Sequence, residues 1–449
     1  MGSFPCVKAL VQIRFCDMIH VEKRSGIANR GFVALMTTMS CGAFNDNVYR
    51  GMLLFMVVGD GLWSGRLGEG GTGIITFMLY APFILLLGFT GLLADRYSKR
   101  RIIVLSRVAE LLLAISVVGA MAIQNMPLAL LLLLLLASQS AFFSPAKYGS
   151  VPEVVDAPML SRANGVMSLL TNVSIVAGVA VAGHLMAAGE SIGVAGPVFV
   201  GLIMVGVAVI GLVSSIMMPR RSAARPDLPI SFNGFRTYWR TFKAMKGTDL
   251  IAATIAWCLF FAVGSLIINI IPNYTAKESL GLTDAEGSNL LGAATLGIAV
   301  GGAVVGIGSG HRIRSTFIPL GAAIMGACFF ILGLCNLGYI SVMVLLFITG
   351  SAAGVFVVPV LALLQHLPVP GFRARCVGTA NFMTYLSMSI SAVIYWTLTK
   401  WIGALPPTWF LISGCFMVVV TIWLLLLLPS LKHAARKESF STVEDEVSG

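Results

Sequence analysis

The chain has 449 residues, of which 57% are hydrophobic and 11% are charged, and its mean hydropathy is +0.91. Soluble domains carry roughly a quarter charged residues, so this composition excludes an ordinary globular protein and indicates that the lipid bilayer is the main solvent. The net charge of +11 could indicate nucleic-acid binding, but its distribution along the chain favours a membrane-topology signal, so no nucleic-acid partner is expected.

Residues 1–30 mix charges with short apolar runs and lack the order of a signal peptide, which predicts a cytoplasmic N-terminal leader. The eight cysteines of the chain show no C-x-x-C spacing, so neither a disulfide framework nor a metal site is expected. No cofactor-binding motif is found either.

A helix needs about 20 apolar residues to cross the hydrocarbon core of a bilayer. Stretches of this kind predict an all-α membrane protein with twelve transmembrane helices. The first six cover about 31–58, 73–94, 102–123, 127–148, 163–187 and 195–218. The second six cover about 248–273, 287–307, 316–336, 339–363, 377–400 and 408–429.

The predicted organisation is therefore a pair of six-helix halves, 31–218 and 248–429, joined by a basic linker at 219–247. Aromatic residues recur at helical spacing between the basic residues of this linker. The pattern is typical of an amphipathic helix on an anionic inner leaflet, and a simple basic tether explains it equally well. The polar tail at 430–449 ends in acidic residues and is predicted to be cytoplasmic and disordered.

The basic residues test this map independently of hydropathy. With both termini in the cytoplasm, external loops hold only Arg66, Lys277 and Lys400 of the 30 basic residues, and two more, Arg50 and Arg107, fall within spans. An odd number of spans would destroy this bias. We therefore expect an even number of spans and cytoplasmic termini.

The loop between the second and third spans, 91–101, fits the G-x-x-x-D-R-x-x-[KR]-[KR] signature of the major facilitator superfamily. In that family the acid is thought to hold an inner gate against the start of span eleven, where a helix N-terminus favours a carboxylate. This likeness makes Asp95, Arg96, Arg100 and Arg101 gating candidates. The alternative is that these charges only fix the topology.

Ionisable residues inside a membrane are costly and indicate function. Asp46 lies within the first span beside Asn47, and Arg50 follows one turn later. An acid and a base at this spacing can pair along one helix face. Either this pair is structural, or the residues line a cavity and meet a polar headgroup; the crowding of further polar side chains favours the cavity.

Arg107 and Glu110 form a second potential pair on span three, for which a structural ion pair is the preferred interpretation. We place no charged residue inside a span of the second half. This asymmetry argues against a long proton-relay chain.

Span four ends in a segment, 144–149, that contains Pro145, Lys147 and Tyr148. Pro145 is expected to bend the helix near the inner leaflet, which makes it a gating candidate. Lys147 is placed either to meet a phosphate or to extend toward the lipid headgroups. Gln139 on the same span is a further substrate-binding candidate, and Arg162, at the head of span five, is a gating candidate.

The segment 141–165 (AFFSPAKYGSVPEVVDAPMLSRANG), together with Phe44-Asn45-Asp46-Asn47 and the stretch 354–365 on span ten, resembles bacterial lysophospholipid transporters. The resemblance covers about 31–429. It implies that Asp46, Asn47, Lys147, Tyr148 and Asn164 are substrate-binding positions.

The family belongs to the major facilitator superfamily and moves lysophosphatidylethanolamine-like lipids from the outer to the inner leaflet of the bacterial inner membrane. There an acyltransferase/acyl carrier protein synthetase restores the second chain. The resemblance thus implies a multi-pass inner-membrane lipid flippase that works by alternating access, serves phospholipid remodelling, is a monomer among membrane lipids and needs no cofactor. It does not imply an enzyme.

Two departures from the family pattern bear on the substrate. Asn45 stands where the family usually has glycine, and span seven, which can carry an arginine in relatives, is uncharged over 251–273. The phosphate-binding arrangement of the second half is therefore either missing or replaced by Arg50.

The alternative function is a major facilitator exporter of a small amphiphilic compound or drug, because an apolar cavity with few charges would serve that role too. A non-transporting scaffold leaves Asp46 and the gate-like loop without a use. An enzyme is disfavoured, since no nucleophile motif, metal cluster or phosphate loop is found.

Overall fold

The computed structural model describes residues 29–447 except for 59–60, 69, 156–159, 222–233, 246–248, 276–280, 310–313 and 368–372. The predicted leader therefore lies outside the described residues, apart from Asn29 and Arg30. All regular structure in the described ranges is α-helical.

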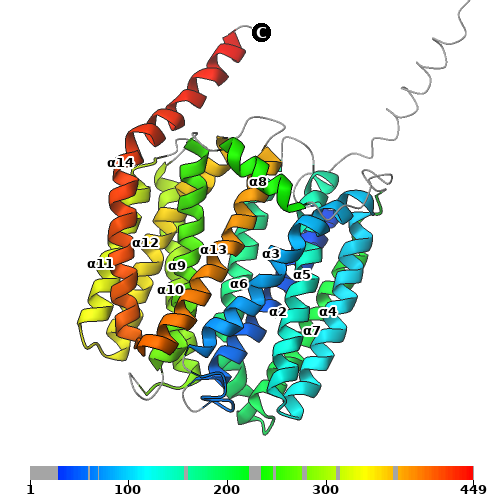
Figure 1. The fold of residues 1–449 in the computed structure, drawn as a ribbon. Helices are drawn as coiled ribbons and strands as arrows, with labels where there is room; N and C mark the ends of the chain where they lie inside the picture. Colours follow the sequence, from blue (N-terminus) through cyan, green and yellow to red (C-terminus); the bar gives the residue numbers. More distant parts are fainter. Residues whose placement is uncertain are drawn as a thin grey trace, which may run out of the picture.

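Twelve long helices and one short one make up the bundle (Figure 1). The first six long helices are α2 (Arg30–Met56), α3 (Gly71–Arg96), α4 (Lys99–Ala122), α5 (Met126–Val154), α6 (Leu160–Ser191) and α7 (Gly196–Ile216). The short helix is α8 (Gly234–Met245). The second six are α9 (Asp249–Thr275), α10 (Asp284–Ser309), α11 (Phe317–Leu334), α12 (Tyr339–His366), α13 (Arg373–Ile402) and α14 (Pro406–Val447).

Nine of the twelve long helices contain a described stretch that is long and apolar enough to cross a membrane. The other three are α2, α3 and α13. Polar side chains interrupt α2 at 45–47 and 50, and the described apolar stretch of α3 is shorter, Gly71–Leu86. Hydropathy alone therefore gives a weak signal for α2, because that helix carries polar residues into the bundle. The prediction of an all-α membrane protein with two six-helix halves is confirmed.

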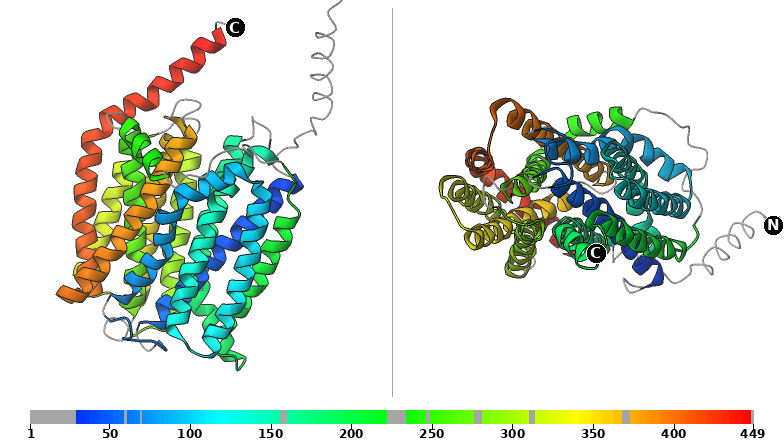
Figure 2. Two further views of the ribbon diagram at one scale, coloured as in Figure 1. Left: turned by 45° about the vertical axis from the view of Figure 1, so that its right-hand side comes forward. Right: turned by 90° about the horizontal axis from the view of Figure 1, so that it is seen from below.

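The two halves lie side by side, with the helices α2 to α7 on one side and α9 to α14 on the other (Figure 2). Figure 1 shows α8 across one end of the bundle, where α14 also ends. This end is called the upper end, and the end where α2 leads into α3 is called the lower end. The first half meets the second mainly through α3 against α13 and α6 against α10.

Side chains close the ends of several helices. Asn29 accepts a 2.8 Å hydrogen bond from Phe32 N and so caps α2. Before α10, Thr283 Oγ1 accepts from Glu286 N at 3.3 Å while Glu286 Oε2 accepts from Thr283 N at 2.8 Å, which is a complete capping box. Local sequence therefore sets where these helices begin.

Glycines allow the closest helix packing in the second half. A side chain at Gly350 or Gly354 would collide with backbone carbonyls of α10, and one at Gly297 or Gly301 would collide with the backbone of α12. Both pairs have the Gly-x-x-x-Gly spacing, which places two small residues on one helix face. The α10–α12 contact therefore depends on the absence of side chains, which accounts for part of the high glycine content.

The linker segment for which an amphipathic helix was one of two predictions is helical in α8. Tyr238 stacks on Phe382 of α13, with ring centroids 4.9 Å apart, and burial raises the pKa of Tyr238. The next residue, Trp239, is 57% exposed, with the Lys243 ammonium 5.6 Å from its ring centroid. The helix thus has one face against the bundle and one aromatic and basic face toward the surroundings.

The prediction that the C-terminal tail is disordered is wrong. Helix α14 continues through the tail to Val447 and projects beyond the bundle (Figure 1). Alanine, lysine, arginine and glutamate dominate the segment 432–438, and their helix propensities are among the highest. Composition that lacks apolar residues predicts the absence of a core, not the absence of a helix.

Candidate functional site

The Asp46 carboxylate is buried between α2 and α5. The Ser140 hydroxyl donates a 2.5 Å hydrogen bond to Asp46 Oδ2, and the Gln139 amide donates to the Ser140 oxygen at 2.9 Å. In the described part of the chain, Asp46 Oδ1 and Gln139 Oε1 have no hydrogen-bond partner although they are shielded from solvent. Asn47 donates instead to its own helix, at Ala43 O. The cluster therefore keeps acceptor capacity on two buried oxygens.

Lys147 lies on α5 about two turns nearer the upper end than Ser140. Its Nζ is 4.9 Å from the ring centroid of Tyr148 and 6.0 Å from that of Phe143, and no described carboxylate forms an ion pair with it. The ammonium is thus held by aromatic faces rather than by an acid. Pro145 lies inside α5, which continues past it to Val154, so proline does not end the helix.

Arg107 and Glu110 form an ion pair on α4, and both side chains are almost completely buried. Asn45 bridges to this pair from α2, since its amide donates a 2.8 Å hydrogen bond to Glu110 Oε1. The Arg107 guanidinium lies 4.2 Å from the ring centroid of Phe143. Asn45 also donates to Met204 O on α7 at 3.1 Å, so the pair and its amide join α2, α4 and α7.

Arg50 does not pair with Asp46, although their spacing along α2 allows it. Its guanidinium donates to the Tyr80 hydroxyl at 2.9 Å and to Thr76 Oγ1 at 2.8 Å, both on α3. Thr76 in turn donates to Asn269 Oδ1 of α9 at 2.7 Å. The pair interpretation of Asp46 and Arg50 is therefore wrong, because α5 supplies a hydroxyl to the acid and α3 supplies two to the base.

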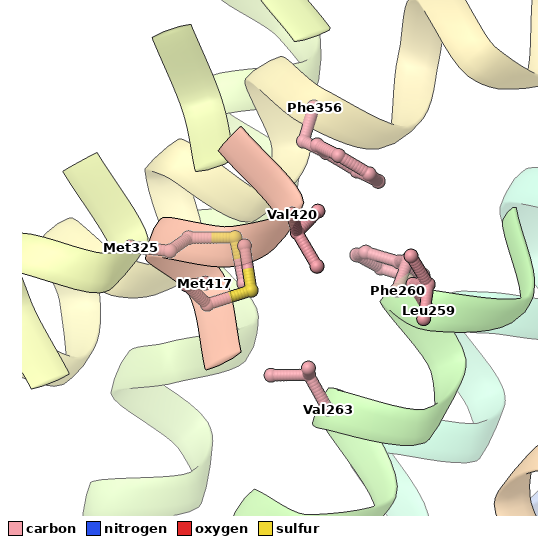
Figure 3. Close-up of a pocket in the computed structure, with 7 residues that line it drawn as sticks. All are labelled: Leu259, Phe260, Val263, Met325, Phe356, Met417 and Val420. Carbon is pink, nitrogen blue, oxygen red and sulfur yellow. The ribbon is translucent and has the colours of Figure 1, made fainter. Parts of the chain in front are cut away.

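Charge is unevenly divided between the halves. Among described side chains, the buried charged residues all belong to the first half: Asp46, Arg50, Lys99, Arg107, Glu110 and Lys147. The second half instead has a narrow apolar pocket between α9, α11, α12 and α14, too small to admit a water molecule. Its lining consists of Leu259, Phe260, Val263, Met325, Phe356, Met417 and Val420 (Figure 3).

Two bases of the predicted gate loop bind within the first half. Lys99 forms an ion pair with Glu153 at 2.6 Å, and Arg100 donates to Ile216 O at the end of α7 at 2.7 Å. Arg96 lies 5.8 Å from the Tyr97 ring centroid, and Arg101 is exposed. The side chains of three candidates lie outside the described set: Asp95, Arg162 and Asn164. The gating role of the loop thus stays a prediction.

The two halves meet at the lower end of the bundle. A side chain at Gly73 would collide with Ala392 O of α13, which shows how closely α3 approaches that helix. Ser288 Oγ of α10 accepts a 2.9 Å hydrogen bond from Gly183 N of α6. Beside it, His184 Nε2 lies 2.9 Å from Asn289 Oδ1. These contacts close the lower end.

Sequence reasoning missed Ser140, Thr76, Tyr80 and Asn269. Each is a neutral residue, and nothing in its local spacing relates it to a charge on another helix. The one available signal was that a buried charge needs hydrogen-bond partners, which indicates that partners exist without identifying them.

Comparison with known proteins defines the class. A family model described as Major Facilitator Superfamily matches residues 35–392. The chain therefore belongs to the Major Facilitator Superfamily and is a multi-pass membrane transporter of that class.

Within that class the chain is similar to curated proteins named lysophospholipid transporter LplT. It is 27% identical over 377 residues to the one from Photorhabdus laumondii, which covers 82% of this chain and 87% of the relative. It is 28% identical over 368 residues to the one from Cronobacter sakazakii, covering 79% and 83%. The resemblance expected from the sequence motifs is thereby confirmed.

Solved structures support the fold. A POT family transporter in complex with a thioalcohol-conjugated peptide has a TM-score of 0.68 at 15% identity, covering 90% of this chain and 96% of that chain. A bacterial homologue of the human lysosomal transporter Spinster, in an inward-facing and unoccupied conformation, has a TM-score of 0.60 at 15% identity, covering 92% and 98%. At this identity the likeness concerns the fold alone.

Proposed function

We propose that the protein moves lysophospholipids of the lysophosphatidylethanolamine type from the outer to the inner leaflet of the bacterial inner membrane. The upper end faces the cytoplasm in this proposal, in agreement with the distribution of basic residues. An acyltransferase/acyl carrier protein synthetase would then reacylate the delivered lipid. The two halves open and close alternately around the site.

The observation that carries the proposal is the placement of two unlike charges on neighbouring helices. Among the described residues, Asp46 on α2 has a buried oxygen without a partner, and Lys147 on α5 has no carboxylate partner. A zwitterionic headgroup carries the complementary charges, so its ammonium would bind Asp46 and its phosphate would bind Lys147. Gln139 and Tyr148 lie next to these charges and belong to the same proposed site.

The single acyl chain needs apolar surroundings. The second half offers them, because its described buried side chains carry no charge and apolar side chains line its narrow pocket, which would have to widen to take the chain (Figure 3). A cargo with a charged headgroup and one hydrocarbon chain therefore matches the division of charge between the halves. The similarity to curated lysophospholipid transporters supports the same substrate class.

The test is reconstitution of the purified protein in liposomes with labelled lysophosphatidylethanolamine. We expect saturable movement that the diacyl lipid does not show and that Asp46→Asn or Lys147→Ala reduces at least tenfold. Lys400→Ala is the matched control, since Lys400 is an exposed base near the Trp396 ring at the lower end.

Movement that survives both substitutions would keep the substrate and discard this headgroup site. No movement above that of empty liposomes, from protein shown to be folded, would refute the proposed substrate. That outcome would favour export of a small amphiphilic compound.

A further inference from the structure

Arg50 is a completely buried guanidinium whose observed partners are all neutral. Its exposed fraction is 0%, and its two bonded nitrogens donate to the hydroxyls of Tyr80 and Thr76. The Tyr80 ring lies 5.3 Å from the guanidinium carbon. No described carboxylate forms an ion pair with Arg50, and its Nε has no hydrogen-bond partner among the described residues.

This arrangement is expensive for a merely structural residue. A buried charge is normally paired, and a charge inside a membrane protein without a counter-charge usually marks a ligand or ion pathway. The nearest acid along α2, Asp46, is bonded to Ser140 instead. Arg50 therefore keeps both its positive charge and part of its donor capacity for a partner outside the chain.

Arg50 also lies at the seam between the halves. The Thr76–Asn269 hydrogen bond joins α3 to α9, whereas the bonds from Arg50 to Thr76 and Tyr80 remain inside the first half. The contact of Gly73 with α13 lies one turn nearer the lower end than Thr76, so it separates the Thr76–Asn269 bond from the lower end. Opening of the lower end would break the Thr76–Asn269 bond and uncover Arg50 together with its own-half partners.

Arg50 and Lys147, the two buried bases that form no ion pair among the described residues, lie on opposite sides of Asp46 along the bundle. With a helical rise of about 1.5 Å per residue, Arg50 is about 6 Å nearer the lower end than Asp46, and Lys147 is about 10 Å nearer the upper end than Ser140, which binds Asp46. A phosphate that travels from the lower to the upper end would thus meet a cation before and after the level of Asp46.

We propose that Arg50 is the phosphate-binding residue of the lower-open state, which receives the cargo phosphate before Lys147 does. This proposal rests on the proposed function for the direction and the cargo. A guanidinium can hold a phosphate through two parallel hydrogen bonds, and the free Nε lies on the same planar group as the bonded nitrogens. When the lower end closes on an empty site, Thr76 accepts the hydrogen bond from Arg50 in place of the phosphate. Its own hydrogen bond to Asn269 then keeps the two halves together at this level.

The experiment measures binding to the full-length protein in detergent, with two ligands of the same acyl chain. Lysophosphatidylethanolamine carries the phosphate, and monoacylglycerol lacks it. We expect Arg50→Gln to weaken binding of the first ligand at least tenfold and to change binding of the second less than twofold. Arg50→Lys should lie between, because an ammonium keeps the charge but loses the two-point geometry.

Asn269→Leu is the matched variant, since it removes the bond across the seam and leaves Arg50 in place. It should keep the affinity for lysophosphatidylethanolamine within about threefold of the wild type. Inorganic phosphate as a competitor separates two sources of the anion: competition at millimolar concentration that Arg50→Gln removes would show that free phosphate also enters the site. Thermal unfolding of each variant reports on folding, and Arg50→Lys gives the readout if Arg50→Gln does not fold.

Equal weakening of both ligands by the Arg50 variants would overturn the proposal and assign Arg50 to structure. So would an Asn269→Leu variant that loses as much phosphate-dependent affinity as Arg50→Gln. Failure of the wild type to bind or move any lysolipid would instead refute the proposed function, and the inference with it.

Discussion

Replacing one member of the Arg107–Glu110 ion pair should destabilise the protein more than replacing both. The side chains are 1% and 0% exposed, so a charge left alone there cannot be solvated by water. Glu110→Gln removes the negative charge and keeps an acceptor for the Asn45 amide, which bonds Glu110 at 2.8 Å. The substitution therefore isolates the loss of charge compensation for Arg107.

The expected magnitude follows from this burial. Loss of one partner from a buried pair costs about 3–5 kcal/mol, whereas replacing both by apolar residues of similar volume is often nearly neutral. In the double variant Arg107→Met/Glu110→Met, Asn45 loses one acceptor but keeps Met204 O at 3.1 Å. That loss should cost no more than about 1–3 kcal/mol. The double variant should thus be more stable than Glu110→Gln alone. The two stabilities would be nearly equal only if the single loss is at the low end of its range and the double loss at the high end.

The assay is equilibrium unfolding of the purified variants in mixed micelles, with Arg107→Met completing the double-mutant cycle. Ser116→Ala is a control on the same helix, because this exposed hydroxyl donates to Leu112 O of α4 and to no other described residue. Single variants that each cost under about 1 kcal/mol would show that the pair is not desolvated as described. A double variant that costs the sum of the singles would show that the two charges do not compensate each other.

Three further outcomes are expected. Gly350→Ala should destabilise the protein by about 1–3 kcal/mol in the same unfolding assay, because the new methyl group would meet Ala294 O. The control Gly264→Ala should be neutral or stabilising, because a methyl group there meets nothing within 4 Å. Equal effects of the two substitutions would refute the packing argument. Asn289→His should make transport sensitive to inhibition by micromolar Zn²⁺, and EDTA should reverse this inhibition. The new ring would face His184 Nε2, which lies 2.9 Å from Asn289 Oδ1, so the two rings could bind the metal together. Transport that is insensitive to Zn²⁺ would show that the two helices do not close there during transport. Val263→Trp should destabilise the protein by about 1–3 kcal/mol in the same unfolding assay, because Val263 is 1% exposed and the narrow apolar pocket beside it has no room for the larger ring. An unchanged stability would show that this pocket is wider than described.

Local sequence predicted the features that depend on one helix at a time. Most spans could be found because each membrane helix satisfies its own backbone hydrogen bonds, so length and apolarity identify it, although the polar residues of α2 weaken this signal. The Arg107–Glu110 pair is of the same kind, since two side chains three residues apart on one helix are neighbours whatever the rest of the chain does. The family resemblance was also carried by short contiguous segments, and the family model confirms it.

The sequence by itself therefore determined the twelve helices, the six-and-six division and the class of protein, while the tertiary structure alone decided which partners the buried charges have. Asp46 and Arg50 have a spacing as favourable as that of Arg107 and Glu110, yet they do not pair. Hydroxyls from α5 and α3 reach them at 2.5 Å and 2.8 Å, and those helices are adjacent only after folding. A buried charge takes the best-placed partner in three dimensions, and spacing along one helix cannot reveal what a second helix brings to it.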